Sequence, residues 1–503
     1  MKKIFTFFLS LNLTHAWIGF FLYSCLVSIL VQFFILPILF PRFHIGSGLL
    51  DGGDWTFYHN KAVELSKAIK SQGWSNWELK PNGFGILGFI TAIYSFFDIY
   101  EPYTLIPFFS ILHSLGAISI VLLIEKLGVN RATSILSSIP FLIFPSSLMW
   151  VAQILKDIFT VNGSILILLG LTSLFSLIQK KIFKYNLIKI FWFFLLIFIG
   201  LALIWLVRPY YVVINQIFIV FIFIIINFYL VFNFLKKKFN FLIIIYILFL
   251  QIILLISVNQ LDGLIKNNLK DINENSLLLS IPSLVLKDNL INLDSSPIQS
   301  SKNLLASESN KNLLASESNK NLLTSESKNS RPIIFKEWSS STYLPTIIDY
   351  ELKKLYLNRV YFYQVQYKAN STFDIHVDLN SFKKLVLYLP RAVQISFFSP
   401  FPSSWFAEHP SQLSKLMHLV YGFEMIIIYF CFLGFIFSIL LWRRKIEFWI
   451  FITFSFYYAL IPTYALPNIG TIVRYRYSAI MILVALGIGA FLHLYSKKLY
   501  INK

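Results

Sequence analysis

Long runs of apolar residues separated by short polar stretches form the main pattern along the chain. A run of about 20 apolar residues is long enough to cross a bilayer as a helix. The pattern therefore predicts an all-α polytopic membrane protein with about ten transmembrane helices. We expect these helices near residues 17–40, 104–124, 132–150, 158–178, 190–206, 211–234, 241–258, 419–441, 448–465 and 478–494.

A shorter apolar stretch at residues 84–97 decides the orientation of the chain. It is too short to span comfortably, so we expect it to lie in the membrane interface. With a cytoplasmic amino terminus, the inner segments then carry nearly twice as many Lys and Arg residues as the outer ones, the very long loop excepted. If the stretch crossed the membrane, every later basic cluster would lie outside, against the positive-inside rule. We therefore expect both termini to be cytoplasmic.

The polar stretches divide the chain into three regions. We expect an amino-terminal membrane domain, which includes the first outer loop, then a long extracytoplasmic loop and a carboxy-terminal set of membrane helices. A nine-residue repeat, KNLLASESN, begins at Lys302, Lys311 and Lys320, and its composition predicts a disordered insert. The stretch 331–418 is richer in aromatic residues and predicts a small, partly ordered unit. The expected boundaries are 1–258 with the outer loop 41–103, 259–418 with the repeat 302–328, and 419–503.

Composition narrows the class of protein further. The chain is 57% hydrophobic and only 13% charged, well below the charged fraction of a typical soluble protein. Its net charge of +19 comes mostly from basic clusters between apolar runs, as membrane topology requires, so we expect no nucleic-acid partner. Cys25 and Cys431 both lie within apolar runs and predict no disulfide framework in the loops. The Lys-, Asn-, Ile- and Phe-rich usage favours a microbial source, and we expect a bacterial inner (plasma) membrane.

The stretch GSGLLDGGDWTFY, residues 46–58, carries the first candidate chemistry. It places Asp51 and Asp54 beside glycines that let the backbone turn, so that both carboxylates can converge on one spot. Charged carboxylates are costly at the bilayer centre, so they belong at the water interface. They can act as a general base or as ligands of a divalent metal ion. The alternative is that both are solvated loop residues, with Asp54 capping the helix that follows.

More charged residues fall on the same outer side in this topology. Lys156 and Asp157 follow a segment broken by prolines, and Arg208, Arg474 and Arg476 lie at span ends beside tyrosines. Arginine grips phosphate bidentately and suits a lipid-linked phosphate. The plainer explanations are mutual neutralisation for the Lys–Asp pair and snorkelling for each arginine. The lone His113 is expected to be a packed residue, and no HExxH, CxxC, GxSxG or P-loop pattern occurs.

The arrangement resembles the GT-C superfamily of polytopic glycosyltransferases, which includes protein mannosyltransferases and lipid A aminoarabinose transferases. Members carry an acidic residue soon after the first span, then juxtamembrane helices, then a second acidic residue in the next outer loop. Asp51 or Asp54 matches the first acidic position, residues 62–97 match the juxtamembrane region, and Asp157 matches the second. The resemblance covers roughly residues 17–178.

The resemblance implies transfer of a sugar from a polyprenyl-phosphate donor to a lipid, glycan or protein acceptor at the outer membrane face. Asp51, Asp54 or Asp157 would be catalytic, with Asp51 or Asp54 taking the proton of the acceptor hydroxyl. The departing phosphate would meet Lys156, Arg208, Arg474 or Arg476. The residues expected to contact substrate are Trp55, Tyr58, His59, Tyr210 and Tyr211. No nucleotide cofactor is implied, and a divalent metal ion is the one cofactor left open.

Three other classes fit parts of the pattern. An O-antigen-type polymerase or ligase also has about ten spans, a long outer loop and outer arginines, but it would not need Asp51 or Asp54. A transporter of lipid-linked sugars predicts ionisable residues in mid-membrane, whereas Glu424 is the main charged residue within the spans. A non-catalytic scaffold that displays the repeat would tolerate loss of every outer charge.

Overall fold

In the computed structural model, the described residues are 8, 10–179, 187–236, 241–269, 336–366, 371–406 and 412–501. Helices account for most of them, and their one sheet is a hairpin of β1 (His44–Gly46) and β2 (Leu49–Leu50). The predicted all-α polytopic class is confirmed. The repeat 302–328, predicted to be disordered, lies outside these residues.

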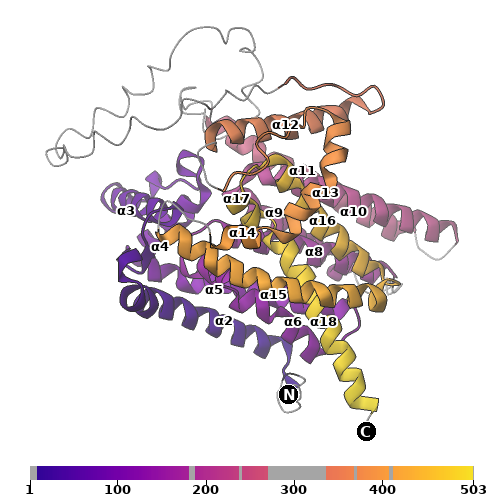
Figure 1. Ribbon diagram of the computed structural model, residues 1–503, viewed down its shortest axis with the longest axis horizontal. Coiled ribbons are helices and arrows are strands. Elements are labelled where there is room, and N and C mark those ends of the chain that lie inside the picture. The colour runs from indigo at the N-terminus through magenta and orange to yellow at the C-terminus, as the bar shows by residue number, and fades with distance from the viewer. Residues whose placement is uncertain are drawn as a thin grey trace.

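Long apolar helices make up the body of the molecule (Figure 1). Within the described part of the chain, eight segments are long and apolar enough to span a membrane, or nine if a bent pair counts as one span. The spanning helices are α2 (Leu13–Leu30) continued by η1 (Val31–Leu39), α5 (Ile106–Lys126), α8 (Asp157–Gln179), α9 (Leu187–Val207), α10 (Pro209–Leu235), α15 (Gln412–Trp442), α16 (Ile446–Ala465) and α18 (Tyr477–Ile501). The expected span 241–258 lies in α11 (Phe241–Leu269), whose apolar part, Leu242–Ser257, is shorter.

The bent pair consists of α6 (Arg131–Ile143) and α7 (Pro145–Ala152), which meet at an angle of 65°. Pro140 lies within α6 and Pro145 begins α7, while Phe144 between them is extended. Proline removes a backbone donor and restricts the preceding residue, so a helix does not continue smoothly through such a sequence. The bend brings the chain to the turn that carries Lys156 and Asp157.

Helix α8 is the most enclosed span, with 94% of its apolar window buried inside the protein, whereas only 22% of the first span is buried. Small residues let α9 approach α8 closely. A Cβ atom added at Gly163 would lie 2.6 Å from the Gly200 carbonyl oxygen, and one at Gly200 would lie 2.5 Å from that of Gly163. Such small-residue contacts are typical of helix packing in membranes.

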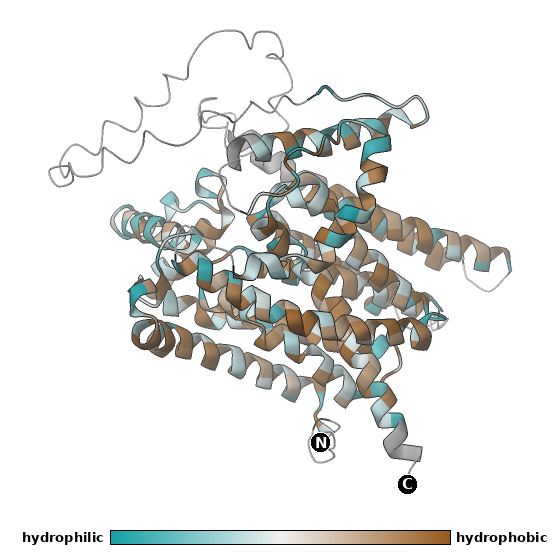
Figure 2. Ribbon diagram, viewed as in Figure 1, coloured by the Kyte–Doolittle hydropathy of each residue, from teal (hydrophilic) through white to brown (hydrophobic). Residues whose placement is uncertain are grey.

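The remaining elements are shorter and more polar, and Figure 2 shows hydrophilic residues concentrated in α3 (Asp54–Gln72) and α12 (Thr346–Gln366). Helix α4 (Gly85–Phe97) has 13 residues, about 20 Å, which is less than a membrane span. In Figure 1, α12 lies at the upper edge and the carboxy-terminal end of α18 at the lower edge. The other short elements are η2 (Pro41–Phe43), η3 (Trp74–Asn76), η4 (Pro81–Gly83), η5 (Pro102–Leu105), α13 (Phe382–Phe398), α14 (Pro402–Trp405) and α17 (Ile469–Tyr475).

Candidate functional site

A glycine-rich turn places Asp54 at the start of α3. Gly52 and Gly53 have φ angles of 71° and 83°, in the left-handed region that glycine adopts at little cost. The turn is closed by the indole of Trp55, whose Nε1 donates to the Leu50 carbonyl at 2.7 Å. The helix is capped by Gly53, so the interpretation of Asp54 as the N-cap residue is wrong. Asp54 instead lies in the first helical turn, where the helix dipole favours an ionised carboxylate.

The two carboxylates of this turn differ in their surroundings. Asp51 is exposed, and its backbone N–H donates to the Phe43 carbonyl at 2.7 Å. Within the described part of the chain, no ion pair or hydrogen bond involves its carboxylate. Asp54 keeps 44% of its side chain exposed but faces Arg474. The turn therefore brings one of the two carboxylates, rather than both, to the charged groups described next.

Gln153 holds the hairpin against the turn between α7 and α8. Its side-chain oxygen accepts the Leu50 N–H at 3.0 Å, and its Nε2 donates to the Gly48 carbonyl at 3.0 Å. The amide thus pairs with the hairpin backbone as a neighbouring strand would. Gln32 adds a bond from its Nε2 to the Ala152 carbonyl at 2.7 Å. These buried contacts place Asp54 near Lys156 and Asp157, which are about a hundred residues away in the sequence.

Asp157 is fully buried at the first residue of α8 and is held by two arginines. Its Oδ1 accepts Nη2 of Arg208 at 2.8 Å. Its Oδ2 accepts Nε of Arg474 at 2.9 Å and Nη2 of Arg474 at 2.5 Å. Arg208 also donates from Nη1 to the Thr160 hydroxyl at 3.2 Å, one turn further along α8. Both oxygens of Asp157 are therefore occupied, and the two arginine charges are partly neutralised.

Arg474 links the buried carboxylate to the accessible one. It lies on the short helix α17, and its Nη2 reaches Oδ2 of Asp54 at 3.3 Å while remaining bonded to Asp157. Burial by itself lowers the pKa of Arg474, but the charge and hydrogen bonds of Asp157 outweigh it and raise the pKa above its ordinary value. The guanidinium is therefore a permanent cation shared by two carboxylates. We call Asp54, Lys156, Asp157, Arg208 and Arg474 the charged cluster.

Lys156 completes the charged cluster with an amine that is half-buried. Among the described residues, no hydrogen bond or ion pair is formed by this amine. Burial lowers its pKa to about 8, with the positive charges of Arg208 and Arg474 acting in the same direction and Asp54 and Asp157 opposing. A buried, underpaired ammonium is costly unless it meets an anion. Three cations and two carboxylates give the cluster a net positive charge, which suits the binding of an anion.

The aromatic candidates surround the cluster unevenly. Tyr210 is exposed and its hydroxyl bonds to that of Tyr475. The Tyr475 ring lies 4.4 Å from the Arg208 guanidinium and 5.2 Å from the ring of buried Tyr211. The Tyr475 ring thus packs over the Arg208 guanidinium that bonds Asp157.

Tyr58 and His59 lie on α3 but face different partners. Tyr58 is buried against the Phe84 ring, and burial raises the pKa of its hydroxyl, with the charge of Asp54 adding to that effect. Its hydroxyl is within electrostatic range of the cluster. His59 bonds through Nδ1 to the Tyr94 hydroxyl at 3.0 Å, and burial lowers the pKa of its imidazole. Its structural partner is therefore Tyr94 rather than a cluster residue.

Arg476 does not join the cluster, although it is two residues from Arg474. It is buried, and its Nη1 donates to the carbonyl oxygens of Ile395 and Ser396 at 2.8 and 2.5 Å, while Nη2 bonds to the carbonyl of Ser399. Burial lowers its pKa to about 10, so it remains charged at neutral pH. Its donors are used to anchor α17 to the end of α13, which leaves the predicted phosphate-binding role to the other cations.

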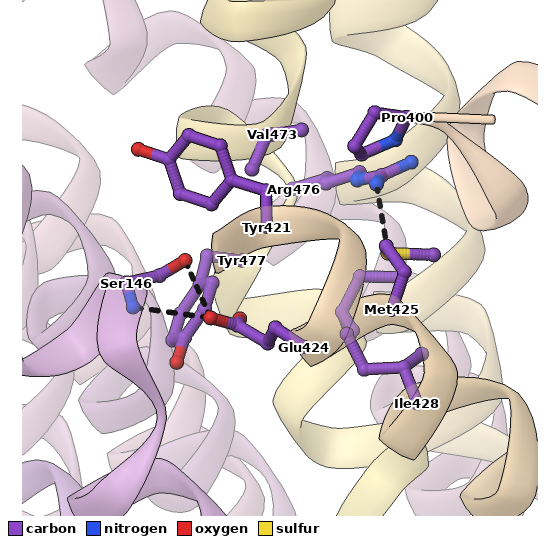
Figure 3. Close-up of a pocket in the computed structure, with 10 residues that line it drawn as sticks. Ser146, Pro400, Tyr421, Glu424, Met425, Ile428, Val473, Arg476 and Tyr477 are labelled. Atoms are coloured by element: carbon purple, nitrogen blue, oxygen red, sulfur yellow. Dashed lines mark hydrogen bonds between the residues drawn. The ribbon is translucent and has the colours of Figure 1, made fainter. Parts of the chain in front are cut away.

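Figure 3 shows the small cavity beside Arg476. Its volume is about 20 Å³, which is room for about one water molecule and not for a sugar. Glu424 faces it and accepts hydrogen bonds from the Ser146 N–H at 3.0 Å and the Ser146 hydroxyl at 2.8 Å. The main charged residue within the spans is therefore part of a helix–helix contact. His113, predicted to be packed, is buried and bonded to Ser24 and Ser147.

Gln153, Thr160 and Tyr475 were not anticipated from the sequence as contributors to the site. Tyr475 could have been suggested by its place between Arg474 and Arg476, two candidate residues. Gln153 carries a weaker signal, a buried amide just before the Lys–Asp pair, and its partners come from the distant hairpin. Asn468 also contributes by capping α17, with its side-chain oxygen accepting the Thr471 N–H at 3.0 Å.

Comparison with known proteins finds no family model, curated protein or solved structure that matches this chain. Across the described ranges, no group of three or more His, Cys, Asp and Glu side chains is placed to hold a metal ion. The functional argument therefore rests on the charged cluster itself.

Proposed function

We propose that this protein is a membrane glycosyltransferase of the GT-C type. It moves a sugar from a polyprenyl-phosphate donor to a lipid, glycan or protein acceptor at the extracytoplasmic face. One observation carries the proposal: the accessible carboxylate of Asp54 shares Arg474 with the enclosed Asp157, next to the half-buried amine of Lys156. A base and an anion-binding group thus lie side by side at the ends of membrane helices.

The residues divide the reaction between them. Asp54 accepts the proton of the acceptor hydroxyl while the oxygen of that hydroxyl forms a bond to the anomeric carbon of the sugar. The bond from that carbon to the phosphate oxygen breaks, and its electron pair leaves with the polyprenyl phosphate. Lys156 and the outward face of Arg474 stabilise the charge on this leaving group, the kind of electrostatic contribution that is usually large in catalysis. Asp157 and Arg208 position Arg474.

Asp54 is a better base than either alternative carboxylate. Asp157 is fully buried and its oxygens accept three arginine N–H groups, so the carboxylate is shielded from a substrate and its negative charge is already compensated. Asp51 has access to solvent, but within the described part of the chain its carboxylate pairs with none of the cluster cations. Asp54 combines exposure with contact to Arg474. The assignment narrows the catalytic carboxylates expected from the sequence to one.

The test is complementation of a strain that lacks the gene, with expression matched between variants. We expect wild type and Asp51→Asn to restore the surface glycan, and Asp54→Asn to fail and to accumulate the lipid-linked donor. Loss of a general base typically lowers the rate about 10²–10⁴-fold. Full complementation by Asp54→Asn would contradict the proposed base.

An O-antigen-type polymerase or ligase is the second candidate, favoured by the two arginines that converge on one buried carboxylate. Such an enzyme would depend on Arg208, Arg474 and Lys156 and would tolerate Asp54→Asn. Adding an Arg474→Gln strain to this complementation set separates the two functions. The transferase predicts that Asp54→Asn and Arg474→Gln both fail, whereas the polymerase or ligase predicts that only Arg474→Gln fails.

A further inference from the structure

A larger cavity than the one beside Arg476 lies at the end of α8 opposite the charged cluster. From Asp157 to Ser176 the helix rises about 30 Å, so the two sites are separate. The cavity has a volume of about 500 Å³. Its walls come from the end of α5, the end of α8 and the turn between α15 and α16, with Lys126, Ser176, Arg444, Lys445 and Glu447 among the lining residues.

The carboxylates at this cavity already have partners. Glu125 accepts both Nε and Nη2 of Arg131, the latter at 3.3 Å. Glu447 is buried and accepts the Ser176 hydroxyl at 2.7 Å. Lys126 has an interaction of its own, and with Arg131 balancing Glu125 the lining still keeps the cations Arg444 and Lys445 against the single carboxylate of Glu447. The remaining charge is therefore positive.

These two cations have donors to offer a ligand. Lys445 donates to the Leu127 carbonyl at 2.9 Å, which leaves two N–H groups of its ammonium. Arg444 is exposed, and within the described part of the chain its guanidinium forms no hydrogen bond or ion pair. A guanidinium fork beside an ammonium is the donor set that suits phosphate, since arginine binds two phosphate oxygens at once.

We propose that this cavity binds a phosphate group that is not neutralised by a cation of its own, carried either by an anionic membrane-lipid headgroup or by a soluble phosphate ester. The volume lies in the range of small-ligand sites and far exceeds that of a trapped water. Apolar Leu122 and Ile446 also line it, beside the ends of membrane spans. Basic pockets between transmembrane helices are a known setting for lipid headgroups. This inference does not depend on the proposed transferase activity.

The test uses the full-length protein in phosphatidylcholine nanodiscs with or without phosphatidylglycerol. Native mass spectrometry counts the phosphatidylglycerol that stays bound, and a titration with glycerol 3-phosphate tests the soluble source. We expect Arg444→Gln/Lys445→Gln to weaken binding about tenfold, since charge-assisted hydrogen bonds are lost. Arg443→Gln is the matched control, because Arg443 is exposed on the same turn but does not line the cavity.

If the double variant fails to fold, the binding measurement uses Arg444→Gln alone, which keeps the Lys445 bond to the Leu127 carbonyl. Phosphatidylglycerol retention without glycerol 3-phosphate binding identifies a lipid headgroup, and binding of glycerol 3-phosphate identifies a soluble ester; both support the proposal. The proposal is overturned if phosphatidylglycerol is retained no better than phosphatidylcholine and glycerol 3-phosphate does not bind. It is also overturned if Arg443→Gln weakens binding as much as the double variant does.

Discussion

Asp54 and Asp157 share one arginine yet lie in opposite environments. Asp157 is fully buried and accepts three hydrogen bonds from Arg208 and Arg474, whereas Asp54 is 44% exposed and has one contact with Arg474 at 3.3 Å. Both stand at the first residue of a helix, so the helix dipole favours the ionised form at both positions. The difference comes from what surrounds each residue.

The comparison separates two roles that the sequence alone assigns to one class of residue. A buried carboxylate with both oxygens occupied orders the arginines around it and cannot easily take a proton. A half-exposed carboxylate beside the same arginine keeps lone pairs for a substrate. Changes at the buried carboxylate should therefore affect folding, and changes at the exposed one should affect only chemistry.

Replacing Asp157 should produce the largest effect on stability. Asp157→Asn leaves Arg208 buried without a counter-charge, and breaking a buried ion pair from one side costs about 3–5 kcal/mol. The measurement is thermal unfolding of the detergent-purified protein. Asp98→Asn is the matched control, because Asp98 forms an exposed pair with Lys70, and loss of such a pair should shift the unfolding temperature far less. Equal shifts in the two variants would mean that burial does not separate these carboxylates.

Replacing the shared arginine tests the link between the two. Arg474→Gln should lower kcat/KM about 10²–10³-fold, the usual loss when one group that stabilises developing charge is removed. Arg474→Lys keeps the charge but lacks the planar guanidinium whose Nε and Nη2 both bond Asp157 while Nη2 reaches Asp54, so we expect it to recover only part of the activity. Steady-state kinetics on matched amounts of folded protein provides the measurement. Full activity in Arg474→Gln would remove this residue from the site.

Deprotonation of Lys156 should change the activity less than loss of Arg474 does, and it should lower the activity as the pH rises. Its pKa is lowered from 10.5 to about 8, so the ammonium is present below that pH and is lost as the pH rises through it. We expect kcat/KM, which reports the free enzyme, to fall above about pH 8. Bound phosphate raises the pKa of the amine, so kcat should fall at higher pH. Lys156→Arg, which stays charged, should abolish the decline; a decline that persists would assign it to another group.

The smallest expected effect is that of Asp54→Asn on folding. Its ion pair with Arg474 is half-exposed, and such pairs contribute about 0–1 kcal/mol. The unfolding temperature of Asp54→Asn should therefore stay close to that of wild type even though activity is lost. A drop as large as that of Asp157→Asn would show that Asp54 is also a structural residue and would break the comparison.

The sequence predicted the membrane class, the extent of most spans and all five residues of the charged cluster, because these follow from local hydropathy and from charges near span ends. It did not separate Arg474 from Arg476. Residues two apart on a helix point in different directions, so one meets Asp157 and the other the end of α13. It also grouped Asp51 with Asp54, since the dihedral angles at Gly52 and Gly53 decide which carboxylate turns inward.

The Gln153 contacts could not be predicted either, because they join segments that are distant in the sequence. They also have a consequence for the evolution of the chain. One side chain matches the hairpin backbone atom for atom, so an insertion on either side would put donors opposite the wrong acceptors. Among related sequences, the β1–β2 hairpin and the turn between α7 and α8 should therefore both keep a constant length, while the membrane helices vary in sequence. Distant relatives should be recognisable by LLDGGD early in the chain followed, in the turn between α7 and α8, by Gln-x-x-Lys-Asp.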